Sequence, residues 1–316
     1  MIRKTAHRVR ALLQASVGRS AIILTYHRVA DLDRDPQLLV VSKARFEAQA
    51  AMLSTRYRVV SLSSLATDLT KHRLQNRTVA ITFDDGYADN LTNARPVLER
   101  HMLPATVFVS SGYIGGEQEF WWDEAERITL GRESDVRWNA LMPPEKDAHR
   151  EYLDLMSELH PLPALIREKA LAEARRRFGI EAGVRSAYRP MTALEVAELD
   201  ASPLLEVGAH SADHEVLQLL EGAHQRTAIE RDKAELERLC GRDIDLFSYP
   251  YGGRDDYGPE TVSIVREVGF RAACANFPGL VKPSSDVFQL PRFVVRDWEA
   301  DELARHIDAW FAGREG

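Results

Sequence analysis

Two adjacent carboxylates, Asp84 and Asp85, directly follow Thr78–Phe83, a run of residues suited to a buried strand. Like charges repel, and burying either carboxylate costs free energy unless a positive group lies nearby. A bound cation would remove both costs. The pair therefore indicates a cation site at a strand end, although an Asp-Asp pair can also simply begin a turn.

Two histidines supply the imidazole nitrogens that such a cation needs. His210 directly follows the apolar run Leu204–Ala209, and His214 comes four residues later. If the chain turns there into a helix or a tight loop, both imidazoles can point at one spot. Two histidines and one carboxylate leave positions open for water and substrate. Each pattern alone is weak, but both at strand ends of one sheet predict a divalent-metal site.

The elements that must position these side chains alternate between short apolar runs and segments with a helical period. This alternation implies βαβ units and parallel pairing, and eight strands suggest an irregular (β/α) barrel with its chemistry at the C-terminal strand ends. The expected strands are Ala21–His27, Tyr57–Leu62, Thr78–Phe83, Ala105–Ser110, Leu204–Ala209, Asp245–Tyr249, Phe270–Ala275 and Val287–Val295. The expected helices are Ala44–Ser54, Ser64–Lys71, Tyr87–His101, Thr192–Leu199, Gln225–Cys240, Pro259–Val268 and Ala300–Phe311.

Residues 112–190 break this rhythm with polar, helical patterns. We expect a helical insertion within one domain spanning residues 21–312, preceded by a basic segment, residues 1–20. The insertion contains Trp121 and Trp122 in the stretch FWWDE. Aromatic faces suit the C–H surfaces of sugars, so Trp122 either lines a substrate site or anchors the insertion to the barrel.

Composition narrows the class of protein. The chain has 316 residues, of which 45% are hydrophobic, which is enough for a large core, and its net charge of −7 argues against a nucleic-acid partner. The two cysteines, Cys240 and Cys274, do not form a disulfide framework, so we expect buried thiols in a reducing compartment. No apolar stretch approaches the length of a membrane-spanning helix.

The N-terminal segment is basic, and its apolar run Ala11–Leu13 is too short for a signal-peptide core. We therefore expect a cytoplasmic protein. Ile2, Val9, Leu13 and Val17 would form a weak apolar stripe on a helix, which either contacts a membrane surface or packs loosely on the domain. The sequence carries no signal for an oligomeric state.

Three motifs occur in a fixed order: TFDDG at residues 82–86, HSADH at 210–214 and SYPYGG at 248–253. They resemble the first three motifs of the polysaccharide deacetylases with a NodB-homology domain, carbohydrate esterase family 4. The resemblance covers roughly residues 20–300, which is essentially the whole alternating region. It implies a deformed (β/α) barrel, a divalent metal that is usually zinc, and the removal of acyl groups from sugar amides or esters.

The resemblance also implies roles for single residues. Asp84 matches the catalytic base, while Asp85, His210 and His214 match the metal ligands. The chemistry agrees, because a metal lowers the pKa of its water and polarises the acetyl carbonyl, and a neighbouring carboxylate can take the proton. Tyr251 matches the position whose backbone N–H stabilises the oxyanion, a role worth about 3 kcal/mol in comparable sites.

The sequence departs from the family pattern in its third motif. Many members carry an arginine there that holds the base aspartate, but Ser248 occupies the matching position. We expect Arg292 to supply the missing cation, with Arg296 as the second candidate. The alternative for either arginine is a surface ion pair, which is worth little.

The late Leu-x-His motif, which supplies the general acid in the family, is not visible near the C-terminus. His27 ends the first expected strand instead, and the first and last strands of a closed barrel are neighbours. We expect His27 to be the general acid or a pocket histidine, or else a structural histidine at the strand end.

Asp297 and Trp298 loosely match an Asp–Trp element of the family in which the tryptophan lines the pocket, although Asp297 also suits a helix N-cap.

These features favour a metal-dependent deacetylase that removes N-acetyl groups from an amino sugar in a polysaccharide, an oligosaccharide or a glycan precursor. Zinc is expected from the ligand types. An O-acetyl esterase or a deformylase acting on a lipid-linked sugar would use the same site. The alternative from another class is a carbohydrate-binding domain with a decayed site, because the third-motif arginine is missing.

Overall fold

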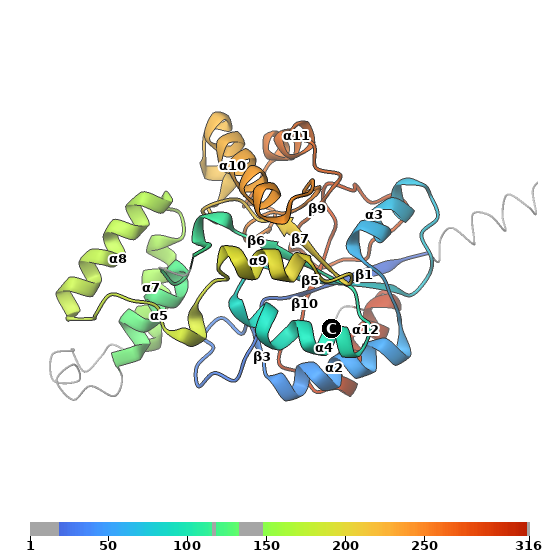
Figure 1. Ribbon diagram of the computed structural model, residues 1–316, viewed down its shortest axis with the longest axis horizontal. Helices are drawn as coiled ribbons and strands as arrows, with labels where there is room; N and C mark the ends of the chain where they lie inside the picture. The colour runs from blue at the N-terminus through green and yellow to red at the C-terminus, as the bar shows by residue number, and fades with distance from the viewer. Residues whose placement is uncertain (1–18, 116–117, 133–147, 315–316) are drawn as a thin grey trace, which may run out of the picture.

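The computed structural model describes residues 19–115, 118–132 and 148–314 (Figure 1). The expected basic segment with its apolar stripe, up to residue 18, lies outside the described residues. Within the described part of the chain, no helix combines the length and apolar character needed to cross a bilayer. Both cysteines are free thiols; Cys274 is buried, and Cys240 is partly exposed at the end of its helix.

Eight strands form one sheet in which every strand pair is parallel. Its order is β10-β1-β5-β6-β7-β8-β9, and β4 also pairs with the start of β5. The strands are β1 (Ala21–Tyr26), β4 (Arg58–Val59), β5 (Thr78–Phe83), β6 (Ala105–Val109), β7 (Leu205–Ala209), β8 (Leu246–Ser248), β9 (Ala272–Cys274) and β10 (Phe293–Val294). They correspond to the eight strands expected from the sequence. A further short parallel pair, β2 (Arg28–Val29) with β3 (Val40–Val41), was not expected.

The sheet curls until its two ends are almost joined. The chain that leads into β10 runs beside β9, where Ala273 donates to the Val287 carbonyl and Ala275 donates to the Leu290 carbonyl, at 3.0 and 2.9 Å. β10 in turn pairs with β1, so the first and last strands are neighbours. The expected deformed (β/α) barrel is confirmed, and this seam between β9 and β10 is its irregular part.

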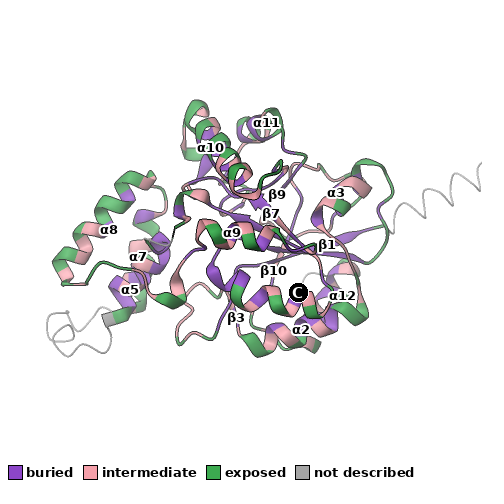
Figure 2. Ribbon diagram, in the orientation of Figure 1, coloured by how far each residue is buried: buried purple, intermediate pink, exposed green. Residues whose placement is uncertain are grey.

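Helices surround the curled sheet, with α10 and α11 on one side and α2 and α12 on the other (Figure 1). Figure 2 shows buried strands and helices that are buried mainly along one face, as in α12, which buries Leu303, Ala304, Ile307 and Trp310. These helices are α2 (Lys43–Arg56), α3 (Leu62–Thr70), α4 (Arg95–Arg100), α9 (Ala193–Asp200), α10 (Gly222–Cys240), α11 (Pro259–Glu267) and α12 (Ala300–Phe311). The helix expected from Tyr87 to His101 instead begins with a π-turn at Asn90–Ala94. Such turns are frequent at functional sites.

The expected insertion contains α5 (Trp121–Thr129), α7 (Ala148–Leu159) and α8 (Ala164–Phe178), which project to one side of the sheet in Figure 1. These helices share an aromatic cluster of their own. The cluster includes Tyr87 and Tyr113, which follow the C-terminal ends of β5 and β6. The insertion therefore packs against the end of the barrel at which the motif residues lie.

Candidate active site

The three motifs meet in one cavity of about 200 Å³ at the C-terminal ends of the strands. Asp84 and Asp85 follow β5, His210 follows β7, and Tyr251 comes shortly after β8. The lining residues are His27, Gln37, Leu39, Asp84, Asp85, Trp122, His210, His214, Tyr251, Asn276, Val294 and Arg296. Seven of these were proposed as site residues from the sequence, together with Arg296 as a candidate cation.

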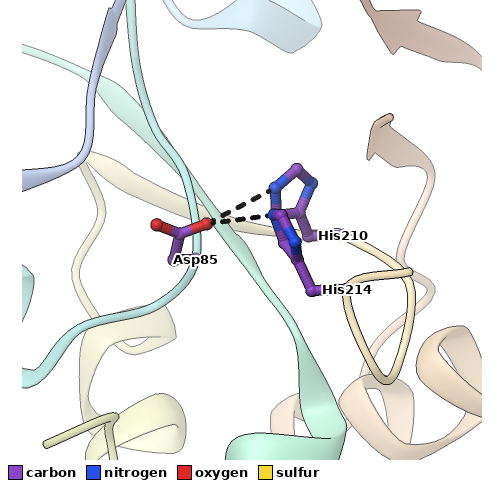
Figure 3. Close-up of side chains that lie close together, drawn as sticks. All are labelled: Asp85, His210 and His214. Atoms are coloured by element: carbon purple, nitrogen blue, oxygen red, sulfur yellow. Dashed lines mark ion pairs between the residues drawn. The ribbon is translucent and has the colours of Figure 1, made fainter. Parts of the chain in front are cut away.

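Asp85, His210 and His214 form a compact group of possible metal ligands (Figure 3). Asp85 Oδ1 lies 3.7 Å from His210 Nε2 and 3.4 Å from His214 Nε2. These separations are too long for good hydrogen bonds. They resemble the ligand–ligand distance of about 3.4 Å that a tetrahedral ion with bonds of about 2.0–2.1 Å requires. All three residues are buried, so the donor set and its spacing fit a divalent ion.

The neighbours of His210 fix its imidazole. Its Nδ1 lies 2.7 Å from the carbonyl oxygen of Ser248, so Nδ1 carries the proton and Nε2 keeps a free lone pair. Asp232, from α10, accepts hydrogen bonds from the backbone N–H groups of His210 and Ser111, at 2.7 and 2.8 Å. Burial lowers the pKa of His210 to about 4 and that of His214 to about 3. Both rings are therefore neutral near pH 7, which is the form that binds metals.

The backbone is strained at this site. Eight non-glycine residues in the described part of the chain have positive φ, and four of them are Asp85 (77°), Ser211 (61°), His214 (47°) and Tyr251 (59°). L-residues rarely adopt this conformation, and each residue held in it costs about 1–3 kcal/mol of folding free energy. Strain that is concentrated in three motifs of one cavity indicates that side-chain placement there has been favoured over stability.

Arg292 forms a buried two-point ion pair with Asp84. Its Nη1 donates to Oδ1 at 2.7 Å, and its Nη2 donates to Oδ2 at 2.6 Å. Nη2 also donates to the Ser248 hydroxyl at 2.9 Å. Burial alone would raise the pKa of Asp84, but the guanidinium outweighs burial and holds that pKa below its usual range. Arg296 instead donates to the carbonyls of Gln37 and Leu38, so the structure brings only the first of the two candidate arginines to Asp84.

His27 lies at the end of β1 and lines the same cavity as the two aspartates. Its backbone carbonyl accepts a hydrogen bond from the Asn90 side chain at 2.9 Å, which ties His27 to the π-turn. Its Nδ1 is buried and has no hydrogen-bond partner among the described residues. Burial lowers the pKa of His27, and the charges of Asp85 and Asp84 oppose this shift only in part.

Tyr251 and Trp122 pack against the metal-ligand group. The Tyr251 ring centroid lies 4.6 Å from that of His214, and the Trp122 centroid lies 4.8 Å from the same ring. Within the described part of the chain, the backbone N–H of Tyr251 makes no hydrogen bond. Trp122 Nε1 donates to the Tyr87 hydroxyl at 2.7 Å. Trp122 is therefore both a wall of the cavity and an anchor of the insertion, so the two alternatives for it coexist.

The expectation that Trp298 lines the pocket is wrong for the described structure. Its ring stacks on His306 of α12 at 4.2 Å and is absent from the cavity lining among the described residues. α12 begins at Ala300, and its apolar face draws the ring towards the barrel exterior. Asp297 accepts hydrogen bonds from Ser42 and Arg45 of the α2 end and is likewise not a pocket residue.

Sequence reasoning missed Asp232, which supports His210 from 22 residues further along the chain. Asp232 lies in a helix rich in charges, and no local pattern distinguishes it from solvated neighbours. Gln37 and Leu39 were also missed. They reach the cavity through the loop that joins β2 to β3, and these strands are too short to show a periodic pattern.

A comparison with family profiles gives a match to the profile described as "Polysaccharide deacetylase" over residues 71–133 and 179–273, which together make half of the chain. The chain belongs to the polysaccharide deacetylase family. The matched ranges contain all three motifs, and the gap between them falls in the insertion.

Curated relatives agree over shorter stretches. The putative polysaccharide deacetylase YxkH of Bacillus subtilis is 35% identical over 95 residues, 29% of this chain and 33% of the relative. Poly-beta-1,6-N-acetyl-D-glucosamine N-deacetylases of Staphylococcus aureus are 29% identical over 111 residues, 31% of this chain and 38% of the relative. The chain thus spans little more than a third of the length of these relatives.

Solved structures share the fold over nearly the whole chain. IcaB from Ammonifex degensii has a TM-score of 0.62 and 20% identity, with 92% of this chain and 98% of that chain covered. The Streptococcus pyogenes deacetylase PplD in complex with acetate has a TM-score of 0.61 and 15% identity, with 91% and 98% covered. At this identity the likeness concerns the fold, and it identifies the curled sheet as the barrel of deacetylases.

Proposed function

We propose that the protein is a metal-dependent N-deacetylase that hydrolyses the N-acetyl group of an amino sugar in a polysaccharide, an oligosaccharide or a glycan precursor. The observation that carries this proposal is the ionised Asp84, clamped by Arg292, beside the group formed by Asp85, His210 and His214. The Staphylococcus aureus relatives are named for poly-β-1,6-N-acetyl-D-glucosamine, which supports N-acetylglucosamine as the unit.

Asp85, His210 and His214 would hold the divalent ion, and one carboxylate with two imidazoles favours zinc. When bound, the metal polarises the acetyl carbonyl and makes its water a nucleophile near neutral pH. Asp84 accepts the proton of the attacking water as general base. Arg292 keeps Asp84 ionised and presents it in one orientation.

The remaining cavity residues serve the other atoms of the acetamide. The unpaired N–H of Tyr251 donates to the oxyanion, and His27 gives a proton to the departing sugar nitrogen. Because burial lowers the pKa of His27, its imidazole is mostly neutral near pH 7, and the proton that Asp84 takes from the water supplies the one that His27 passes to the nitrogen. Trp122 offers an apolar face to the sugar ring.

Acetate release from β-1,6- and β-1,4-linked N-acetylglucosamine oligomers tests the proposal. Zinc-loaded protein should release acetate, whereas chelated protein and Asp84→Asn should be slower by about 10²-fold or more. Asp213→Asn is a matched control, because Asp213 lies in the second motif but pairs with Arg231 outside the cavity. Acetate release by Asp84→Asn at the wild-type rate would contradict the assigned base.

The same chemistry would serve an O-acetyl esterase or a deformylase on a lipid-linked sugar, because each reaction attacks an acyl carbonyl with water. O-acetylated and N-formylated sugars in the same assay distinguish these alternatives. The non-catalytic alternative rested on the missing third-motif arginine. Arg292 contacts both Asp84 and the Ser248 hydroxyl, so the absence of an arginine from the third motif no longer favours the non-catalytic alternative.

A further inference from the structure

A second, smaller cavity adjoins the active-site cavity and shares Gln37, Leu39 and Trp122 with it. Its volume is about 20 Å³, which is room for one water-sized group. Asp123 and Tyr152, both from the insertion, line it. The two cavities are therefore neighbouring positions along one surface, separated by the Trp122 side chain.

Three carboxylates, those of Asp35, Asp123 and Glu126, line this second cavity together with two arginines, Arg28 and Arg34. Arg34 Nη1 lies 3.8 Å from Glu126 Oε1. Glu126 pairs with Arg185 at 2.7 Å, and Arg28 is bound by Asp89 through Nε and Nη2 at 3.0 and 2.9 Å. Asp123 forms no ion pair within the described part of the chain, and its Oδ2 accepts only the Tyr87 hydroxyl, at 2.6 Å. Burial raises the pKa of Asp123 to about 7 because the nearby arginines compensate only in part.

The cavity also holds an unused polar group. The Tyr152 hydroxyl is buried and has no hydrogen-bond partner among the described residues, and its residue is 1% exposed. A buried hydroxyl without a partner is unfavourable and usually marks a position that a water or a ligand completes. A group that donates hydrogen bonds and carries positive charge would satisfy both Asp123 and Tyr152.

We propose that this cavity binds the primary ammonium group of a sugar unit that has already lost its acetyl group, so that the enzyme prefers partly deacetylated chains. The inference rests on the proposed function, because N-deacetylation itself leaves an ammonium on each processed unit. An ammonium is water-sized and carries three donors, which matches the volume, the Asp123 carboxylate and the acceptor oxygen of Tyr152. The neighbouring N-acetylated unit then lies on the other side of Trp122, in the active site.

The test compares fully N-acetylated trimers with trimers that carry one free amine. The wild type should process the amine-bearing trimer with about tenfold higher kcat/KM, mainly through KM, because a charged hydrogen bond is added. Asp123→Asn and Tyr152→Phe should bring this ratio towards one. Asparagine keeps an acceptor for Tyr87, and Tyr152→Phe removes a hydroxyl without a partner, so both variants should fold. Tyr257→Phe, whose hydroxyl lies at another surface, is the matched control and should keep the ratio.

Equal kcat/KM for the two trimers in the wild type, or a ratio that Asp123→Asn leaves unchanged, overturns the inference. Calorimetric binding of glucosamine oligomers to the wild type and to Asp123→Asn separates the two proposals. If no substrate releases acetate but the oligomers bind at least tenfold more weakly to the variant, the proposed function fails and the ammonium site survives. Methylammonium, which has the cation without a sugar, should compete for the cavity and lower the preference for the amine-bearing trimer. If only sugar-linked amines compete, recognition lies in the sugar ring, and the cavity is not the binding site.

Discussion

Replacing Arg292 by alanine should lower the free energy of unfolding and impair Asp84 as the general base. The Arg292 guanidinium makes five hydrogen bonds, to Asp84 twice and to Thr82, Ser248 and Ala275 once each. Removing one partner of a buried ion pair typically costs about 3–5 kcal/mol, because the other charge is left without compensation. We expect Arg292→Ala to lose stability in this range, and Arg292→Lys to lose less because it keeps the charge.

The sign of the pH effect follows from Asp84. In the wild type the pKa of Asp84 is held below its unfolded value, so its ionisation stabilises the fold above the unfolded pKa, and this contribution is lost as pH falls through the folded pKa. Without Arg292, burial dominates and raises the pKa of Asp84 above its usual range. The stability difference between wild type and Arg292→Ala should therefore widen as pH increases from 3 to 6. The acid limb of acetate release should move to higher pH in the variant.

Urea unfolding at several pH values and acetate release against pH measure these effects. Arg296→Ala is the contrasting variant, because Arg296 contacts backbone carbonyls and not Asp84. Its acid limb should stay where the wild type has it. The reasoning is refuted if Arg292→Ala keeps both the wild-type acid limb and the wild-type free energy of unfolding. The double variant Ser248→Arg/Arg292→Ala, which moves the cation to the usual family position, should recover part of the lost activity.

Three further results are expected. Zinc at a hundred times its Kd should stabilise the wild type by about 2.7 kcal/mol and His214→Ala far less, as thermal unfolding with and without chelator measures; equal shifts would argue against His214 as a ligand. Asp123 has a pKa of about 7 when folded, so its proton is bound more tightly in the folded state and stability falls as pH rises from about 4 to 7. Asp123→Asn should therefore gain urea resistance relative to the wild type between pH 4 and pH 7, and a constant difference would contradict that pKa. Asp232→Ala leaves the N–H of Ser111 unpaired, at about 1–3 kcal/mol, and leaves the N–H of His210 only its longer bond to the Val109 carbonyl, at 3.2 Å. The variant should therefore weaken zinc binding measured by calorimetry, and unchanged zinc affinity would limit Asp232 to a structural role.

Long elements with a clear period were predictable from the sequence. Thr78–Phe83 and Ala300–Phe311 have the same bounds in the structure as in the prediction, because their apolar patterns are local properties of the chain. The strand predicted at Val287–Val295 is only Phe293–Val294, since the residues before it pair with β9 through isolated bonds. Such partial pairing depends on the barrel seam and leaves no local pattern.

Part of the candidate site was likewise predictable from local sequence patterns, and part depended on the tertiary structure. Asp84, Asp85 and His210 directly follow β5 and β7, and His214 comes four residues after His210. Their meeting follows once these strands lie parallel in one sheet, with only β6 between them. The direction of a ring after the last strand does not follow from the order of the strands. Trp298 was placed wrongly for this reason, because α12 supplies a competing surface in His306.

The seam also explains why an arginine from a different segment can hold the base. Arg292 directly precedes β10, and its Nε donates to the carbonyl of Ala275, the residue that follows β9, at 2.7 Å. Its guanidinium then reaches Asp84 beside the Ser248 hydroxyl. One side chain thus links the two ends of the curled sheet and orients the proposed base, because barrel closure brings β10 beside β1 and β1 beside β5. A substitution that loosens the seam should therefore affect Asp84 before it affects His210 or His214, which are held from β7 and α10 on the other side of the site.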